Sequence, residues 1–437
     1  MYDVIGAHAR LSEIYRLYVE SAFPFRYPAL DRERHAILGQ SGILAQEPLI
    51  EPIPLYPLSD YTITTAEQRL GKEYTGLTAL SAGLLPPAAR LYQHQWDALN
   101  AVVKKKKDIV VTTGTGSGKT ECFLLPLLAE LALESTKWEP CGGNIERFWW
   151  RDKYPRISQW SHSARPHAIR ALILYPLNAL VEDQLRRLRT TLDSPDVHKW
   201  LDKHRARNRI LFGRYTGLTP VPGVSTSKSS LKRLRNSLQQ TDAEWRRIES
   251  VLEQEGSDPD IRYHFPQIDG GEMWSRWDMQ ETPPDILITN YSMLNIMLMR
   301  RIEDDIFTKT KRWLQSDQSN LFFLIVDELH SYRGTPGTEV AYILRLFLDR
   351  IGLSPDSDQL RILGTSASVE ENNKSVKFLR DFFGRSDRFD LISGKQVSPK
   401  RDSRVHLYSY SSNFGNLATA IQTDPLALPL KIHTVMP

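Results

Sequence analysis

The most constraining feature of this chain is a glycine-rich stretch that lies between two apolar segments. The run Val110-Val111-Thr112 leads into it, and the run Cys122-Phe123-Leu124-Leu125 follows it. This order predicts a strand, a phosphate-binding loop and a helix, and it disfavours the alternative of a solvated loop with a surface lysine. Glycines allow backbone N–H groups to converge on an anion at the helix N-terminus, where the helix dipole favours negative charge. The residues of the predicted loop are Gly114, Thr115, Gly116, Ser117, Gly118, Lys119 and Thr120.

The loop sequence also indicates the ligand. We expect Lys119 to reach the β- and γ-phosphates of ATP, and we expect the Thr120 hydroxyl to hold Mg²⁺. A strict phosphate-loop pattern has glycine where this chain has Thr113. ATP and Mg²⁺ are therefore the predicted cofactors of a P-loop NTPase whose loop departs from the strict pattern at one position.

An acidic segment far along the chain supplies a second half of the predicted site. The apolar run of residues 321–326 is typical of a strand buried on both faces of a parallel sheet, and Asp327-Glu328-Leu329-His330 follows it. Ligands gather at the carboxyl ends of parallel strands, so Asp327 and Lys119 can face the same nucleotide. We expect Asp327 to hold Mg²⁺ and Glu328 to act as the general base on water. The alternative is a pair of surface acids at a strand end.

These two segments resemble the motifs of superfamily 2 DExH-box helicases, and other segments follow in that family's order. The segment of residues 91–95 is similar to the one that contacts adenine, which assigns that role to Tyr92 and Gln95. The resemblance implies nucleic-acid contacts for five residues and a coupling role for four. The first set is Pro176, Asn178, Arg214, Thr289 and Asn290, and the second is His330, Thr365, Ser366 and Ser368. Ser368 stands where the family usually has threonine.

A narrower resemblance comes from the run of residues 327–334. It is similar to the YprA/MrfA type of bacterial DNA-repair helicase and to large helicases of anti-phage defence systems of the DISARM and Druantia type. This branch favours single-stranded DNA as the partner, although motifs that grip phosphates leave RNA open. Repair and antiviral defence both fit the sequence.

The predicted fold class is α/β: a RecA-like parallel sheet flanked by helices, with an N-terminal accessory region and helical or irregular insertions. We assign residues 1–85 to the accessory region and residues 86–370 to the first RecA-like helicase domain, with insertions near residues 134–167 and 220–284. Residues 371–437 form a C-terminal extension that leads to a missing second RecA-like domain, because the chain after Ser368 is far shorter than the ~150 residues of another α/β domain. That domain is expected in a longer chain or in a partner chain.

Composition predicts a cytoplasmic protein with no membrane partner. The two cysteines are too few for a zinc site or a disulfide framework, and the start of the chain lacks the order of a signal peptide. The net charge of +4 is weak support for nucleic acid, and the run Lys104–Lys107 is more typical of a surface turn. The tryptophans of residues 134–167 are more typical of a small folded core than of base stacking.

Two functions follow from this sequence. The preferred one is an ATP-dependent nucleic-acid helicase or translocase, of which this chain is the N-terminal motor half. The alternative is an assembly module that binds nucleotide without hydrolysing it and recruits a partner protein.

Overall fold

A computed structural model describes most of the chain in two compact units. One unit contains residues 1–55 and 396–437, and the other is Tyr56–Lys395. The described residues are 4–40, 42–46, 55–114, 116–142, 148–151, 155–176, 178–223, 227–254, 258–332, 334–367, 369, 373–386 and 389–397. The predicted site residues Thr115 and Ser368 and most of the predicted C-terminal extension lie outside these residues. The side chain of Asn178 is also outside the description.

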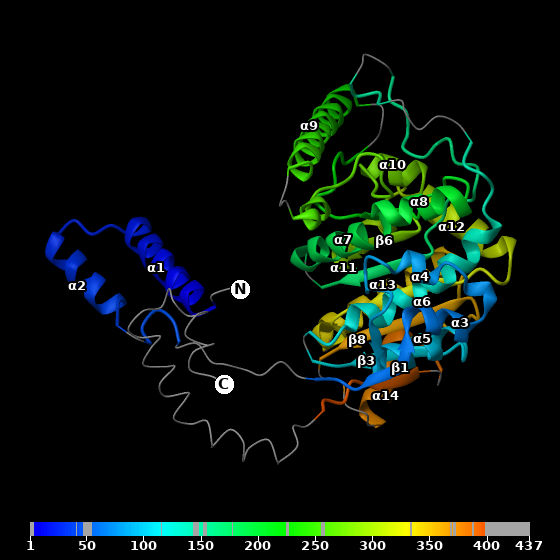
Figure 1. Cartoon of the computed structure of the whole chain (residues 1–437), viewed down its shortest axis with the longest axis horizontal. Helices are drawn as coiled ribbons and strands as arrows, with labels where there is room; N and C mark the ends of the chain where they lie inside the picture. The colour runs from blue at the N-terminus through cyan, green and yellow to red at the C-terminus, as the bar shows by residue number, and fades with distance from the viewer. Residues whose placement is uncertain are drawn as a thin grey trace. The chain divides into compact units, whose positions relative to one another are not determined.

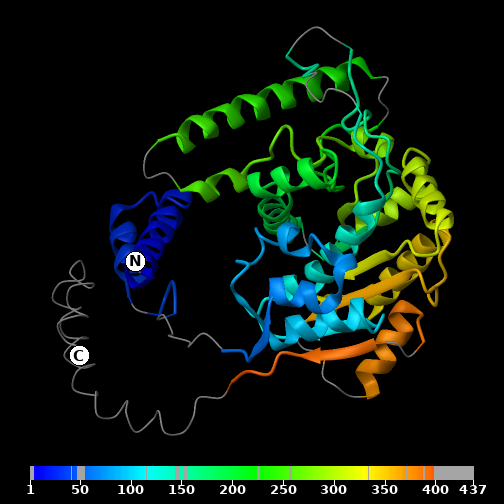
Figure 2. The same ribbon diagram turned by 45° about the vertical axis from the view of Figure 1, so that its right-hand side comes forward.

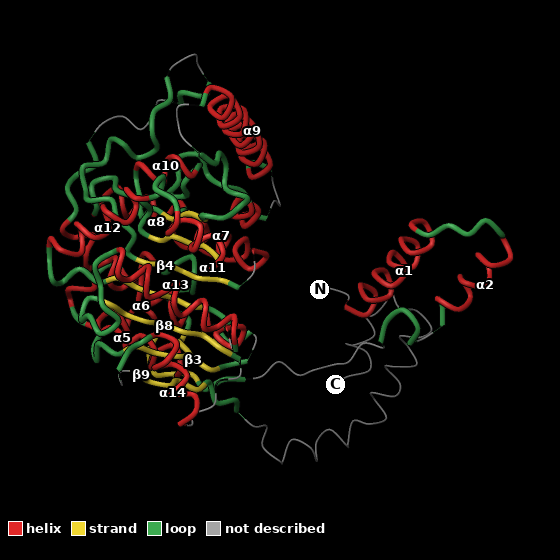
Figure 3. The backbone as a smooth tube through the Cα atoms, turned by 180° about the vertical axis from the view of Figure 1, so that it is seen from behind, coloured by secondary structure: helices red, strands yellow, loops and turns green. Residues whose placement is uncertain are grey.

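The larger unit is built on a seven-stranded sheet in which every neighbouring pair of strands is parallel. Figure 3 shows these strands side by side, with helices on either side of them. In spatial order the strands are β5 (Phe212–Arg214), β6 (Ile286–Asn290), β4 (Ala171–Tyr175), β7 (Phe322–Val326), β8 (Leu360–Ser366), β3 (Asp108–Thr112) and β9 (Phe389–Ser393). The predicted RecA-like parallel sheet flanked by helices is therefore confirmed.

The strands are apolar on both faces because helices cover both. Along β7, Phe323 and Ile325 join one hydrophobic core, whereas Phe322, Leu324 and Val326 join the other. Burying each such side chain stabilises the fold by roughly 1.5–3 kcal/mol. The first core contains α3 (Ile63–Leu70), α4 (Leu77–Leu80), α5 (Gln93–Val103), α6 (Lys119–Glu134), α7 (Asn178–Leu192) and α8 (Pro195–His204). The second contains α10 (Arg276–Glu281), α11 (Tyr291–Met299), α12 (Asp304–Ser316), α13 (Thr335–Arg350) and α14 (Asn373–Phe383).

The compact unit extends beyond the predicted limits of residues 86–370 at both ends. Before residue 86, the strand β1 (Leu58–Thr62) pairs with β2 (Arg90–Tyr92), and α3 and α4 bury apolar side chains in the first core. After residue 370, α14 packs in the second core and β9 extends the sheet beside β3. The packing divides the chain after residues 55 and 395 because α3, α4 and α14 bury their apolar side chains in the two cores of the sheet.

A buried ion pair fixes the later of these segments. Arg385, which follows α14, donates through Nε to the carboxylate of Asp108 at the start of β3, and both side chains are fully buried. Asp108 also accepts from the backbone N–H of Ile362 in β8 at 2.9 Å. The Asp108 carboxylate therefore joins β3 to β8 and to the segment between α14 and β9.

The two predicted insertions share one small core. Trp149 and Trp150 from the first insertion pack with Leu234 and Leu238 of α9 (Lys228–Leu252) and with Trp277 from the second. Figures 1 and 2 both show α9 standing apart from the sheet. The tryptophans of the first insertion do not form one core among themselves, because Trp138 packs against the first sheet core and Trp160 joins the second.

The smaller unit contains a pair of helices, α1 (Val4–Ala22) and α2 (Pro28–Leu38). Four apolar side chains of α1 are exposed: Leu11 by 67%, Ile14 by 62%, Tyr15 by 53% and Tyr18 by 62%. Within the described residues, no helix is both long and apolar enough to cross a bilayer.

Candidate nucleotide and nucleic-acid site

The predicted phosphate loop joins the end of β3 to the start of α6. Gly116 and Gly118 adopt φ values of +74° and +77°, which side chains with a Cβ rarely adopt. A Cβ on Gly118 would also lie 2.3 Å from Nε2 of Gln95. Lys119 and Thr120 form the first turn of the sixteen-residue helix α6. The loop therefore has the strand, glycine turn and helix N-terminus that anion binding requires.

The first turn of α5 is hydrogen-bonded to this loop. Oε1 of Gln95 accepts from the backbone N–H of Tyr92 at 2.9 Å, and Nε2 donates to the carbonyl of Gly118 at 3.4 Å. Nε2 of His94 lies 2.8 Å from the carbonyl of Ser117. Gln95 thus positions the phosphate loop, and its predicted contact with adenine, like that of Tyr92, stays a prediction. The positioning role of His94 was not foreseen from the sequence.

The acidic segment meets the loop at the adjacent end of β7. Nζ of Lys119 lies 3.4 Å from Oε1 of Glu328. The Thr365 hydroxyl at the end of β8 donates to Asp327, whose Oδ1 also accepts from the Glu328 N–H at 3.0 Å. Nδ1 of His330 lies 3.2 Å from Oε2 of Glu328. Strand order explains the meeting, because β8 is the neighbour of both β3 and β7.

Burial dominates the electrostatics of Asp327. It raises the pKa of Asp327, with the hydrogen bond from Thr365 and the charge of Lys119 acting in the opposite direction. Glu328 adopts φ of +51°, a conformation that costs a non-glycine residue roughly 1–2 kcal/mol. Such strain persists only where the surroundings enforce it, and here the Lys119 contact and the Thr365 hydroxyl hold the segment.

Three segments predicted to face nucleic acid end at this same edge of the sheet. Pro176 follows β4, Arg214 ends β5, and Asn290 ends β6. Arg214 contacts Glu182 of α7, and partial burial lowers the pKa of its guanidinium. Oδ1 of Asn290 accepts from the backbone N–H of Met293 at 2.8 Å and caps α11. The structure brings these segments together.

Thr289 differs from the prediction. Its side chain is fully buried, and its hydroxyl donates to the backbone carbonyl of Tyr215 at 2.7 Å. The residue points into the sheet because it is the penultimate residue of β6, one position before the end that reaches the surface. Thr289 therefore positions the segment that carries Arg214, and its side chain is not exposed for a phosphate contact.

The predicted coupling residues lie directly behind the acids. Thr365 and Ser366 are fully buried at the end of β8. Thr365 contacts both Asp327 and the backbone of Glu328, at 3.4 Å in the second case. A displacement of Asp327 or Glu328 would therefore be transmitted to β8 through the Thr365 hydroxyl.

One acidic residue of the loop helix was missed by sequence reasoning. Glu121 follows Thr120, and its Oε1 lies 3.4 Å from Nη1 of Arg187 on α7. Burial raises the pKa of Glu121, and within the described residues its Oε2 has no hydrogen-bond partner. The charged pair ties the loop helix to α7. Because 66 residues separate Glu121 from Arg187 in the sequence, no local pattern predicted their contact.

Comparison with known proteins shows what part of this chain is similar to. Residues 92–216, which include the glutamine segment, the phosphate loop and Arg214, match the family model described as DEAD/DEAH box helicase. The chain is 33% identical over 429 residues to the Druantia protein DruE of Escherichia coli (strain UMEA 4076-1), an alignment that covers 89% of this chain and 22% of DruE.

The chain contains a DEAD/DEAH box helicase domain.

Two further similarities cover larger parts of the chain than the family model does. The ATP-dependent helicase YprA of Bacillus subtilis (strain 168) is 24% identical over 279 residues, which cover 64% of this chain and 23% of YprA. A crystal structure of the helicase MrfA bound to DNA is similar over 74% of this chain and 30% of MrfA, at 20% identity and a TM-score of 0.41. The chain thus spans about a quarter of the length of the curated relatives it matches.

Proposed function

We propose that this chain is the N-terminal motor half of an ATP-dependent DNA helicase or translocase. The observation that carries the proposal is the meeting of Lys119 and Glu328, 3.4 Å apart, beyond the carboxyl ends of β3 and β7, the two parallel strands that flank β8. A lysine at a helix N-terminus with an acid beside it matches the needs of phosphoryl transfer to water. The family to which the domain belongs supports the assignment.

The residues present fit ATP and Mg²⁺. Mg²⁺ is usually held by one or two carboxylates together with substrate phosphates and water, and Asp327 and the Thr120 hydroxyl would supply the protein ligands. When bound, the ion would neutralise charge that develops on the phosphates. Lys119 would hold the β- and γ-phosphates, and Glu328 would accept a proton from the attacking water. Glu328 is suited to this because its Oε2 lies beside His330 and its side chain is one-quarter exposed.

The same edge of the sheet supports binding to a nucleic-acid backbone. Pro176, Arg214 and Asn290 follow three adjacent strands, β4, β5 and β6, so they form a row along one edge. Contacts of this type bind phosphates and sugars and do not read sequence. We propose single-stranded DNA as the partner, and we favour antiviral defence over repair because the relative with 33% identity is a Druantia protein.

We further propose that a second RecA-like domain completes the site. In phosphoryl transfer an arginine finger is worth ~10³ to 10⁵ in rate, and a closed cleft excludes water from the reacting groups. The described residues contain one parallel sheet of the RecA-like kind. The rest of a longer chain, or another protein, would supply the second.

The test combines nucleotide binding with hydrolysis. Lys119→Ala is expected to weaken binding of a fluorescent ATP analogue at least tenfold without lowering the unfolding temperature, because its ammonium lies in the site and not in a core. Lys105→Ala is the matched control, since this exposed lysine lies before β3, at the opposite end of that strand. Wild-type affinity in Lys119→Ala would contradict the nucleotide site.

A measurement of ATP hydrolysis then distinguishes a helicase or translocase from a non-hydrolysing assembly module. The 437 residues are expected to hydrolyse ATP slowly, and a longer protein or a partner with a second RecA-like domain is expected to restore turnover stimulated by single-stranded DNA. Tight nucleotide binding with no turnover in the longer protein would favour the non-hydrolysing module. Robust DNA-stimulated turnover by the 437 residues alone would contradict the need for a second domain.

A further inference from the structure

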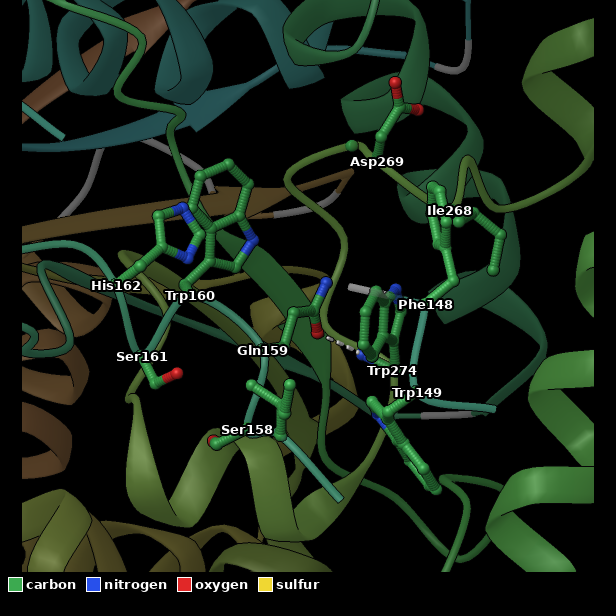
Figure 4. A pocket seen from close by; sticks show the side chains of 12 residues that line it. Phe148, Trp149, Ser158, Gln159, Trp160, Ser161, His162, Ile268, Asp269 and Trp274 are labelled. Carbon is green, nitrogen blue, oxygen red and sulfur yellow. Dashed lines mark hydrogen bonds between the residues drawn. The ribbon is translucent and has the colours of Figure 1, made fainter. Parts of the chain in front are cut away.

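A cavity lies where the two insertions meet. It has a volume of about 130 Å³ and is lined by aromatic side chains from both insertions. Figure 4 shows Trp149 and Trp160 from the first insertion and Trp274 from the second around this space. Two contacts fix the position of the Trp149 ring. It packs edge-on against Trp150 with ring centroids 6.1 Å apart, and the guanidinium of Arg235 lies over it. The cavity therefore has a fixed wall.

Polar atoms around this cavity lack partners. Within the described residues, Nε1 of Trp149, Nε1 of Trp274, Oγ of Ser158 and Nε2 of His162 are buried and make no hydrogen bond. Trp149 is only 1% exposed. A buried indole N–H normally finds an acceptor, because burying an unpaired donor is costly. Because the two indole N–H groups can only donate, a ligand that satisfies them carries hydrogen-bond acceptors.

The charge of the lining limits the class of ligand. Its described residues include no lysine or arginine, and Asp269 is the acidic residue at the rim. A phosphate would therefore be repelled, and an ammonium group would leave the two indole N–H donors without acceptors. A neutral planar ring with carbonyl or ring-nitrogen acceptors fits both the aromatic walls and the donors. Nucleobases have this chemistry.

The cavity is linked to the proposed DNA-binding edge. Nε2 of Gln159, a lining residue, donates to the carbonyl of Glu272 at 2.8 Å. The backbone N–H of the next residue, Met273, donates to the carbonyl of Phe212 at 2.8 Å. Phe212 begins β5, the strand that ends at Arg214. The segment that carries Trp274 therefore lies alongside β5, the short strand whose last residue is Arg214.

We propose that this cavity receives one unstacked nucleobase of the bound single strand. Trp149 and Trp274 would donate to the acceptors of the base, and the aromatic walls would replace the stacking that the base loses. The inference rests on the proposed binding of nucleic acid. It adds a contact to a base where the motor edge alone would grip only the backbone.

The test compares two fluorescein-labelled probes of equal length, oligothymidine and an abasic strand that keeps the sugar-phosphate backbone. The variant Trp149→Phe/Trp274→Phe retains the apolar walls and removes both unpaired donors. We expect its affinity for oligothymidine to fall by about 5- to 100-fold, as two lost hydrogen bonds would cause, while its affinity for the abasic strand is unchanged. Trp313→Phe is the matched control, because Trp313 is buried in the second sheet core. Ser158→Ala, which removes one unpaired hydroxyl, is expected to act in the same direction and replaces the double variant if that variant does not fold.

The outcomes separate the two proposals. Unchanged binding of oligothymidine by the variants would overturn the base pocket alone. An equal loss for both probes would overturn it as well, because the effect would then come from the backbone-binding edge. Failure of the wild-type protein to bind either probe would overturn the nucleic-acid function itself and the pocket with it.

Discussion

Nζ of Lys119 and Oε1 of Glu328 are 3.4 Å apart although 209 residues separate them in the sequence. The ammonium group of Lys119, which would hold phosphates, therefore also offsets the negative charge of Glu328, which would activate water. Phosphates that bind at the loop must compete with Glu328 for the same ammonium group. The two residues consequently have opposite effects on nucleotide affinity, which makes their separate roles measurable.

The first prediction concerns Glu328→Gln. The substitution removes the competing charge, so the affinity for an ATP analogue is expected to stay the same or to rise by about two- to fivefold. Hydrolysis by the longer protein is expected to fall by about 10²- to 10⁴-fold, the range for loss of a general base. Titration with a fluorescent analogue and a phosphate-release assay measure the two effects. Retained turnover would exclude Glu328 as the base.

The second prediction concerns the pH dependence that follows from Asp327. Burial raises its pKa in the folded state, so the folded protein favours the protonated acid and stability is lost as pH rises through that raised pKa. Asp327→Asn is therefore expected to raise the unfolding temperature at pH 7 and to have little effect near pH 3, where the acid is protonated in both states. The same variant is expected to lose Mg²⁺-dependent nucleotide binding. Thermal unfolding across this pH range checks the first effect, and equal shifts at both ends would contradict it.

The third prediction concerns Arg214 and salt. The log of the affinity for single-stranded DNA is expected to fall linearly with the log of salt concentration, at roughly 0.7 per phosphate neutralised. Arg214→Gln is expected to weaken binding and to reduce the slope by about one phosphate equivalent. Arg350→Gln is a suitable control, because Arg350 pairs with Asp304 at the C-terminus of α13 and does not follow a strand end. An unchanged slope in Arg214→Gln would remove this residue from the interface.

The fourth prediction concerns the buried pair of Asp108 and Arg385. Arg385→Met leaves a buried carboxylate without its partner and is expected to destabilise the larger unit by about 3–5 kcal/mol. Adding Asp108→Leu removes the isolated charge, so the double variant is expected to recover part of that loss. Urea unfolding of the two variants measures the difference. A double variant no more stable than the single one would mean that the bond from Ile362 to Asp108, and not the charge pair, dominates.

The sequence was sufficient to predict that Lys119 and Glu328 meet, because each residue belongs to a local pattern. The glycine turn beside Lys119 and the acids after the apolar strand of residues 321–326 are each recognisable within a few residues, and parallel strands bring them to one edge. Local patterns could not predict that the Thr289 side chain is buried, because a shift of one position along a strand moves a side chain from the surface to the interior. The same holds for the ion pair of Asp108 and Arg385, whose partners are 277 residues apart.

The shared core of the two insertions has a consequence for how this protein folds. Residues 148–151 leave the ribosome well before α9, and their tryptophans have no complete apolar surroundings until α9 and Trp277 have been made. Contacts this distant in sequence form slowly, and apolar side chains that wait for them are prone to aggregation. The part of the chain that carries the cavity is therefore expected to acquire its structure late, and shortening either insertion would expose the tryptophans of the other.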